Sequence, residues 1–449
     1  MVEFRFMARA VLACGVAGIV LGGGLSDAMG AARVVVISPH NESIRHEFRE
    51  AFRRHHEQRF AEPAEVEWRD MGGSTDALRF VLSEFARKPD GIGIDCFFGG
   101  GLEPFLRLTA QGLTEACLLP PEVIDGIPQT ANGVDVYDPQ QRWFGAALSS
   151  FGILQSPRIQ RLTGLPAIST WEQLADPALC GWVGAGDPRN SGTMSTMFEC
   201  FLQAFGWEKG WSVLARIGGN TRKFDRFSAT TAKDVSLGET AYAMAIDFYG
   251  FTQVAAAGRT NLTFTLPRDF STLVPDGIAL LKGAPNRLAA ERFMAFVLGE
   301  PGQKLWFLPR GHPEGPQRYS MERMAVRPDF YARFRGISNI ETSPFDLSQP
   351  FAYDGALARA RGEVVAALVG ALLVDTHTEL RRAWRAVIRR GLEAADIEAL
   401  GRTPITDAEA RALAAGPWKD PVIRNQKKIE WQQWAQEKYL RLESHARRR

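Results

Sequence analysis

Three times along the chain, a short apolar run is followed by a small polar turn and then by residues with helical periodicity. Residues 33–38 (RVVVIS) are rich in β-branched residues, and residues 39–52 continue with a helical pattern that Asn41 is placed to cap. Residues 64–85 repeat this order around the turn GGST, and residues 180–205 repeat it around DPRNSGT. Strands that alternate with helices predict an α/β protein with largely parallel sheets. Such sheets bind ligands at the carboxyl ends of their strands, where all three polar turns lie.

These polar turns suit an anionic or hydroxyl-rich ligand. The N-terminus of a helix presents unpaired backbone N–H groups and a partial positive charge, and Ser and Thr hydroxyls add further donors. The same residue types are also the commonest helix caps, so simple capping is the alternative explanation for any single turn. Three such turns in one chain, each directly after a strand, favour a binding role.

The length of 449 residues exceeds what one hydrophobic core usually serves, so at least two lobes are expected. Residues 143–156 and 263–286 are extended, alternating stretches on either side of the third unit, and they predict two crossings that form a hinge. The expected division is a signal peptide over 1–32, a first lobe over 33–145 and 269–349, a second lobe over 146–268, and a helical extension over 350–449.

The N-terminus has the pattern of a secretory signal peptide. Arg5 and Arg9 precede the apolar run 10–25, and small residues follow it in SDAMGAA, so cleavage is expected after Gly30 or Ala32. An uncleaved membrane anchor fits less well because the run is short and rich in glycine. The mature protein is therefore expected in the periplasm.

Export leaves four cysteines, which are Cys96, Cys117, Cys180 and Cys200. They are too few and too scattered for a disulfide scaffold or a CxxC metal site. Cys180 and Cys200 either form a disulfide, if the helix after residue 186 packs back on its strand, or remain buried thiols. The seven histidines show no metal-ligand spacing, so neither a metal site nor a cofactor is expected.

The C-terminal third mixes loops with helices. The Pro- and Arg-rich stretch that ends near residue 355 is expected to form loops over the surface. The apolar run 364–374 is too short to span a membrane, so it is expected to pack against a lobe. The basic and aromatic residues 427–449 are expected to form a solvated terminal helix, with contact to a partner or a membrane surface as the alternative.

Residues 238–251 (GETAYAMAIDFYGF) contain an apolar strand that leads to Asp247, Phe248 and Tyr249 at its carboxyl end. An acid beside aromatic rings suits recognition of hydroxyl or amino groups. Alternatively, Asp247 caps the next helix and Tyr249 only packs.

Enzyme motifs are mostly absent from the sequence. It contains no GxxxxGK[ST] phosphate loop, no HExxH and no GxSxG, and GAGDPR lacks the third glycine of a dinucleotide-binding loop. We therefore expect a binding protein without a catalytic step. The alternatives are an exported metal-dependent phosphate-ester hydrolase that uses Asp247, and the ligand-binding subunit of a membrane sensor whose helical tail contacts a kinase.

Taken in order, these segments resemble the extracellular solute-binding proteins of ABC importers, specifically the ferric-iron-type group. The resemblance covers roughly residues 33–310 and includes VVVISPHNESIRHEFREAF, GGSTDAL, CGWVGAGDPRNSGTM and LGETAYAMAIDFYGF. It implies a type II periplasmic binding fold, in which two lobes close on a solute, and an ABC permease as partner. A monomer is expected, and the net charge of +2 gives no field that would attract nucleic acid.

The resemblance also implies the residues that line the cleft. They are Ser38, His40, Asn41, Ser74 and Thr75 in the first lobe, Ser149 near the hinge, and Ser191, Gly192, Thr193, Asp247 and Tyr249 in the second lobe. Ferric-binding members carry two adjacent tyrosines where this chain has Phe248 and Tyr249. One phenolate ligand is therefore missing, which favours a phosphorylated sugar or a phosphonate over ferric iron.

Overall fold

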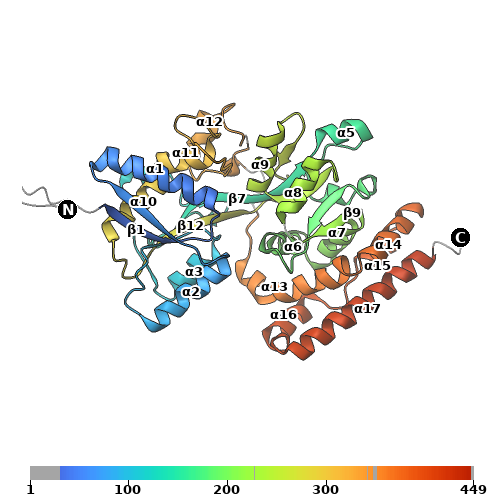
Figure 1. The fold of residues 1–449 in the computed structure, drawn as a ribbon. Helices are drawn as coiled ribbons and strands as arrows, with labels where there is room; N and C mark the ends of the chain where they lie inside the picture. The colour runs from blue at the N-terminus through green and yellow to red at the C-terminus, as the bar shows by residue number, and fades with distance from the viewer. Residues whose placement is uncertain (1–30, 227, 341, 347–350, 446–449) are drawn as a thin grey trace, which may run out of the picture.

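The computed structural model describes residues 31–226, 228–340, 342–346 and 351–445, without the side chains of Thr75 and His445. Figure 1 shows two α/β lobes side by side, with a helical extension packed against the second. The signal peptide expected over 1–32 lies outside the described residues except for its last two.

The strands are β1 (Ala32–Ile37), β2 (Ala64–Arg69), β3 (Cys96–Phe98), β4 (Thr114–Glu115), β5 (Thr130–Ala131), β6 (Val134–Asp135), β7 (Phe144–Gln155), β8 (Val183–Gly186), β9 (Thr221–Asp225), β10 (Tyr242–Ile246), β11 (Thr263–Thr265) and β12 (Leu273–Leu281). The α-helices of the lobes are α1 (Glu42–Phe60), α2 (Ser74–Arg87), α3 (Glu103–Ala110), α4 (Pro121–Ile124), α5 (Pro157–Thr163), α6 (Gly192–Phe205), α7 (Trp207–Asn220), α8 (Ser228–Leu237), α9 (Asp247–Ala257), α10 (Arg287–Leu298), α11 (Glu300–Phe307) and α12 (Asp329–Arg333). The extension contains α13 (Gly355–Val369), the π-helical turn η4 (Gly370–Val374), α14 (His377–Arg389), α15 (Ala394–Gly401), α16 (Asp407–Ala415) and α17 (Pro421–His445). Short 3₁₀ turns are η1 (Glu172–Ala175), η2 (Pro177–Leu179), η3 (Pro344–Asp346) and η5 (Pro417–Lys419).

One strand path runs through both lobes, in the order β2-β1-β3-β12-β7-β10-β8-β9. β1 is parallel to β2 and β3, and β8 is parallel to β9 and β10. Residues 144–150 of β7 pair with β12, and residues 151–155 pair with β10 and β11, so β7 passes from one lobe into the other. The predicted α/β class with hinge strands is confirmed. The expectation of largely parallel strands is wrong, because β12 is antiparallel to β3 and β7, and β7 is antiparallel to β10. The boundaries expected after residues 145 and 268 fall inside β7 and shortly before β12, and they stay a prediction.

Helices cover both faces of the sheet in each lobe. In the first lobe α1, α10 and α11 pack on one face, while α2 and α3 pack on the other. In the second lobe α6 and α7 pack on one face, and α8 and α9 on the other. The predicted apolar face of α6 is buried through Met194, Met197, Phe198, Phe201 and Leu202. The helical periodicity read from the sequence therefore identifies the core-facing side chains.

The extension is packed on the second lobe rather than held apart from it. The apolar run 364–374 is buried against α6 and α7, as the sequence predicts. Trp384 of α14 is 1% exposed, and its Nε1–H donates to Oδ1 of Asn220 at 2.7 Å. The expectation of a mainly solvated last helix is wrong, because α17 buries Trp431 and Tyr439. The long helix thus continues the core of the second lobe.

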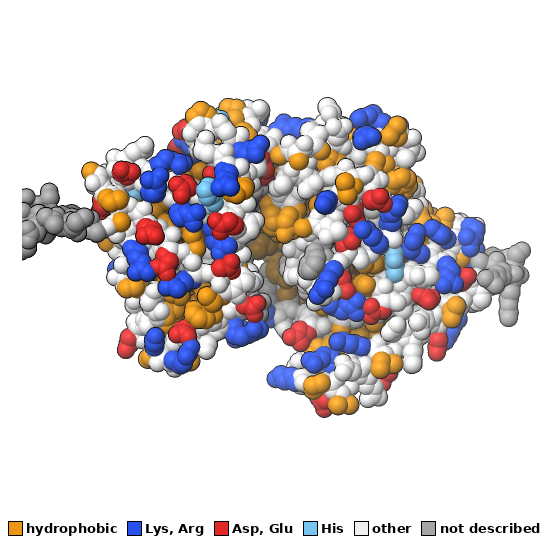
Figure 2. Space-filling model, viewed as in Figure 1, with side chains coloured by type: hydrophobic (Ala, Val, Ile, Leu, Met, Phe, Trp, Pro, Cys, Tyr) orange, Lys and Arg blue, Asp and Glu red, His pale blue; other side chains and the backbone are white. Residues whose placement is uncertain are grey.

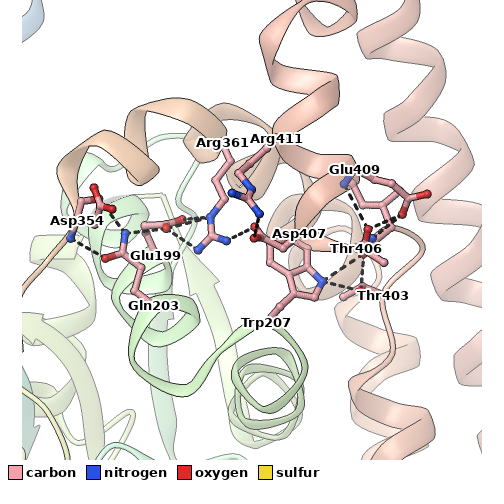
Figure 3. A network of polar contacts seen from close by, with 11 residues as sticks. Glu199, Gln203, Trp207, Asp354, Arg361, Thr403, Thr406, Asp407, Glu409 and Arg411 are labelled. Carbon is pink, nitrogen blue, oxygen red and sulfur yellow. Dashed lines mark hydrogen bonds and ion pairs between the residues drawn. The ribbon is translucent and has the colours of Figure 1, made fainter.

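A buried ion pair secures the extension. Arg361 of α13 donates to both carboxylate oxygens of Glu199 on α6, with Nη2 at 2.7 Å, and both side chains are 3% exposed. Figure 3 shows Arg361 between Glu199 and Asp407, with Trp207 close by. Because an unpaired charge at this depth is costly, the pair fixes how α13 sits on α6.

The stretch after α11 differs from the expectation of surface loops. Residues 321–327 are buried, and the N–H of Leu148 in β7 donates to the carbonyl of Met324 at 2.9 Å. The N–H of Val326 donates to Oε1 of Gln303 at 2.9 Å. This segment has no regular secondary structure, but hydrogen bonds to neighbouring elements satisfy its backbone polar groups. It can therefore be buried next to the hinge strand.

The described cysteines are Cys96, Cys117, Cys180 and Cys200, and all four are free thiols. Cys180 and Cys200 therefore remain thiols and do not form a disulfide, although Cys180 is only half-buried. Within the described ranges, no helix combines the length and the apolar character needed to cross a bilayer.

The packing of the extension can be tested at Gly219. A Cβ atom there would lie 2.5 Å from the ring of Trp384, so Gly219→Ala is expected to destabilise the protein by about 1–3 kcal/mol in chemical denaturation. Gly362→Ala on α13 is the control, because its Cβ would meet nothing within 4 Å, and it is expected to be neutral or to stabilise by about 1 kcal/mol. Equal effects of the two variants would contradict this view of the interface.

Candidate ligand-binding cleft

The two lobes face each other across a furrow. Figure 2 shows this furrow between the lobes, with hydrophobic side chains at its base. The parallel strands of each lobe end at a common edge of their sheet, so the loops after β1, β2 and β3 form one wall and those after β8, β9 and β10 form the other. Segments far apart in the sequence are thereby brought to one site.

The first wall begins with the loop after β1. Ser38 is fully buried, and its Oγ accepts from the N–H of His40 at 3.1 Å. Asn41 is exposed, and its Oδ1 accepts from the N–H of Ile44 at 3.1 Å, so it caps α1 as predicted. Ser38 therefore shapes the loop, while Asn41 and the first turn of α1 face solvent.

His40 is held in a buried position behind this wall. Its Nε2 lies 2.9 Å from Oδ2 of Asp276 on β12. Burial lowers the pKa of His40, so the ring is neutral and Nε2–H donates to the carboxylate. Burial acts to raise the pKa of Asp276, but His40, Arg323 and the N–H of Gly101 together hold it well below its usual range. Asp276 therefore stays ionised inside the protein.

A run of three glycines after β3 completes the first wall. Gly99, Gly100 and Gly101 have φ angles of 93°, 95° and 78°, a region that side chains disfavour. A Cβ on Gly99 would lie 2.5 Å from the His40 ring, and one on Gly100 would lie 3.0 Å from Oγ of Ser74. The glycines thus let the loop pass between His40 and Ser74, which begins α2. The side chain of Thr75 lies outside the described part.

Arg323 occupies the junction between the lobes. Its Nη1 forms an ion pair with Asp276, and its guanidinium lies 4.4 Å from the centre of the Phe248 ring on the second lobe. The side chain is 10% exposed. A cation from the segment expected to be a surface loop is therefore placed at the base of the cleft, in contact with both lobes.

Asp247 follows β10 at the same junction, beside Ser149 of the hinge strand. Both residues are buried, and neither carboxyl oxygen of Asp247 makes a well-formed hydrogen bond within the described structure. Burial raises the pKa of Asp247 to about 7, against the opposing effects of Arg323, of the N–H groups of Phe248 and Ser150, and of the Ser149 hydroxyl. The group is poised between its acid and its carboxylate form at neutral pH.

The ring of Tyr249 points elsewhere. It packs on the cluster of Leu154, Ala232 and Val235 within the second lobe. Phe248, rather than Tyr249, contacts Arg323. The packing alternative for Tyr249 therefore describes its position here, and its assignment to the ligand stays a prediction.

The second wall is built around the start of α6. Oγ of Ser191 accepts from the N–H of Met194 at 3.3 Å, which caps the helix. Gly192 is exposed and Thr193 is half-buried. Their N–H groups belong to the first turn, which has no intrahelical acceptor, so they are available to an anion.

Acidic side chains also occur on this wall, but cations accompany them. Asp187 binds Arg189 at 2.8 Å. Lys223 lies 3.2 Å from Asp225 and 2.7 Å from Asp234. Burial raises the pKa of Asp225. The charges of the second wall are thus largely compensated.

Sequence reasoning missed four features of this site, namely Asp276, Arg323, Arg189 and the three glycines. The glycine run after a strand and the lone acid within the apolar run LVPDGIALL are visible signals for two of them. Arg323 has no such signal. Among the described residues, no group of three or more His, Cys, Asp or Glu side chains is arranged to hold a metal ion.

The chain has the two-lobe, type II periplasmic binding fold, which confirms the fold implied by the resemblance. Residues 104–318 match the family of bacterial extracellular solute-binding proteins, so this part of the chain is similar to that family. Members bind small solutes and work with ABC permeases, and the family implies a periplasmic location.

Individual proteins show the same relationship. The phosphoglycerate transport regulatory protein PgtC of Salmonella typhimurium is 28% identical over 159 residues, which are 35% of this chain and 39% of that protein. The chain spans 39 to 60% of the length of the curated relatives it matches. A putative extracellular solute-binding protein from Bordetella parapertussis aligns with a TM-score of 0.57 and 17% identity, over 76% of this chain and 98% of that one. The apo ferric ion-binding protein A of Pasteurella haemolytica aligns with a TM-score of 0.52 and 16% identity, over 76% of this chain and 97% of that one.

The raised pKa of Asp247 predicts a specific pH dependence of stability. Between about pH 4 and pH 7, the folded protein keeps a proton that the unfolded chain has lost, so the free energy of unfolding falls as the pH rises, by up to about 1.4 kcal/mol per unit. Asp247→Asn removes this contribution, so the variant gains stability relative to the wild type across that window. Denaturation at a series of pH values measures the difference.

Asp90→Asn, which removes a fully exposed carboxylate, serves as the control and is expected to leave the pH profile unchanged. Parallel profiles for the wild type and Asp247→Asn would show that Asp247 ionises normally.

Proposed function

We propose that the chain is the periplasmic binding subunit of an ABC importer and captures a small, phosphate-bearing organic anion by closure of its two lobes. Neither a catalytic step nor a bound cofactor is part of this function. The solute would lie in the furrow between the walls, in contact with the start of α6 and with the loops after β1, β2 and β3.

The observation that carries this proposal is the convergence of helix N-termini at the facing edges of the two sheets. α1 and α2 start from the first wall with Asn41 and Ser74, and α6 starts from the second wall with Ser191, Gly192 and Thr193. Each N-terminus has a partial positive charge and N–H donors that suit phosphate oxygens. An anion that accepts hydrogen bonds from both sides of the furrow would hold the two lobes together.

The positive charge of Arg323 also favours an anionic ligand. It is the buried cation at the base of the cleft, and in this region of low dielectric its charge is felt more strongly than at the surface. Asp276 neutralises much of it, which lets Arg323 stay buried without an anionic solute. Arg323 would thus contribute attraction without requiring that the site be filled.

A phosphate ester fits these groups better than ferric iron does. N–H and O–H donors surround phosphate oxygens without a metal, whereas ferric iron needs hard anionic ligands. Phe248 stands at one of the positions where the resemblance implies tyrosine, and Tyr249 packs into the second lobe. The relative PgtC is named for phosphoglycerate transport, which points to the same solute class.

Closure would follow from the arrangement of the strands. β7 and the segment leading into β12 connect the lobes, so small backbone rotations near Ser149 would swing one wall towards the other. Closure excludes water from the solute, and the closed form would be what the permease recognises. The chain would act as a monomer in this cycle.

A second candidate is the ligand-binding subunit of a membrane sensor. The name of PgtC describes a regulatory protein, and the helical extension offers an additional surface on the second lobe. The same cleft and solute would serve either role. Loss of signalling with solute binding retained, after replacement of the exposed Val422 and Ile429 on α17, would favour this role.

The proposal is tested by titration calorimetry with 3-phosphoglycerate, glycerol 3-phosphate, glucose 6-phosphate and a phosphonate, next to glycerate, glucose and ferric citrate. At least one phosphorylated compound is expected to bind, and its unphosphorylated counterpart is expected not to. Ser191→Ala should weaken that binding about five-fold, as expected for one hydrogen-bonding group.

Ser156→Ala is the matched control. Ser156 caps α5 through the N–H of Ile159 at 3.3 Å, and Figure 1 places α5 at the far end of the second lobe. Both variants should lose about 1 kcal/mol of stability, but only Ser191→Ala should lose affinity. Binding of ferric citrate alone, or equal affinity for phosphorylated and unphosphorylated compounds, would refute the proposed solute class.

A further inference from the structure

The C-terminal extension adds helices α13 to α17 to the second lobe. The protein from Bordetella parapertussis is covered over 98% of its length by only 76% of this chain. About a quarter of this chain therefore lies outside that alignment. The question is what the additional helices do for the cleft.

Arg189 connects the extension with the loop that leads into the start of α6. Arg189 follows β8, two residues before Ser191, and its guanidinium lies between two carboxylates. Its Nη2 donates to Asp187 at 2.8 Å and to Oδ1 of Asp375 at 2.9 Å, and its Nη1 donates to Oδ2 of Asp375 at 2.8 Å. Asp375 thus receives the two parallel bonds that a planar guanidinium makes best.

The extension is shaped to receive this arginine. A Cβ atom on Gly370 would lie 2.7 Å from Cδ and Nη1 of Arg189, so a larger residue would displace the arginine from this position. Gly370 begins the π-helical turn η4, and the N–H of Asp375 at its end donates back to the carbonyl of Gly370 at 2.8 Å. π-Turns within helices often occur at functional sites.

Asp375 itself is firmly held. The Thr376 hydroxyl donates to the carbonyls of Ala371 and Leu372 at 3.0 and 2.9 Å. The hydroxyl of Tyr439 on α17 donates to the carbonyl of Leu372 at 2.8 Å. The Asp375 carboxylate therefore projects from a turn that hydrogen bonds from Thr376 and from α17 hold in place.

On the other side of Arg189, the loop is organised by Asp187. Its Oδ1 accepts from the N–H of Arg189 at 2.9 Å, and its Oδ2 accepts from the side chain of Asn190 at 3.2 Å. Its N–H donates to the carbonyl of Asp225 in the neighbouring strand at 2.8 Å. The same carboxylate thus fixes the turn that leads into Ser191 and holds one side of the guanidinium.

We infer that Asp375 of the extension is a positioning residue for the cleft, and that it fixes the loop 187–193 through Arg189. Asp187 holds the guanidinium from within the same loop, whereas Asp375 holds it from the extension. Asp375 thus ties Arg189 to the turn between α13 and α14. The effect on solute binding rests on the proposed function, whereas the effect on the loop does not.

The test is hydrogen exchange of the ligand-free protein, followed by calorimetry with the phosphorylated compound that binds the wild type best. In Asp375→Asn, amide exchange within residues 187–193 should be about five-fold faster, and affinity should fall by about three- to thirty-fold. Exchange in β8 and β10 should stay unchanged, which separates loosening of the loop from general destabilisation. Asp375→Glu, which keeps the carboxylate, should recover part of both effects.

Asp396→Asn is the matched control. It removes the ion pair with Arg390, which lies within the extension and has an Nε to Oδ2 distance of 2.6 Å, without touching the loop. Unchanged exchange in residues 187–193 of Asp375→Asn, or the same change in Asp396→Asn, would overturn the inference. Faster exchange with unchanged affinity would also overturn it, because the anchored loop would then not matter for binding. If no phosphorylated compound binds the wild type, the proposed function fails, and exchange alone decides whether Asp375 positions the loop.

Discussion

The ion pair between Asp276 and Arg323 joins the segments on which the cleft depends. Asp276 lies on β12, Arg323 lies on the buried segment beside β7, and the guanidinium stacks on Phe248 of the second lobe. His40 and the N–H of Gly101 satisfy the remaining positions of the carboxylate, so the first wall is tied to the same pair. Removal of one partner from such a buried pair typically costs about 3–5 kcal/mol, because the other charge is left uncompensated. The ion pair therefore holds the first wall and the segment 321–327 together, and lobe motion is left to the backbone of the hinge strands.

The remainder of the site follows from the direction of the strands. Parallel strands in each lobe bring their carboxyl ends to one edge, and β7 sets the two edges opposite each other. Small polar residues at these edges start helices, so dipoles and N–H groups from both lobes face the furrow. The first wall is shaped by loops of its own lobe. The second wall, by contrast, is held by Asp375 of the extension through Arg189, so the additional helices contribute to the shape of the binding site.

Much of this architecture is predictable from the sequence, and the rest is not, for physical reasons. Local patterns predict β1, the cap at Asn41, the buried face of α6 and the strand before Asp247, because each depends on neighbouring residues. Arg323 lies 47 residues from Asp276 in a stretch without periodicity, and Arg189 lies 186 residues from Asp375. Only the folded chain creates these pairs. The proline and arginine content of the stretch after α11 indicates loops. It does not reveal that hydrogen bonds with Gln303 and Leu148 allow this segment to be buried.

The central claim is that the lobes close on a phosphate-bearing solute, and the distance between them measures this most directly. Leu106 on α3 and Ala229 on α8 are exposed on opposite lobes and accept spin labels after replacement by cysteine, with Cys180→Ser removing the one half-buried native thiol. Electron–electron resonance should give one distance distribution for the free protein and a distinctly displaced one with a saturating phosphorylated solute. The unphosphorylated counterpart should leave the distribution unchanged. The same distribution with and without every phosphorylated compound would contradict the account.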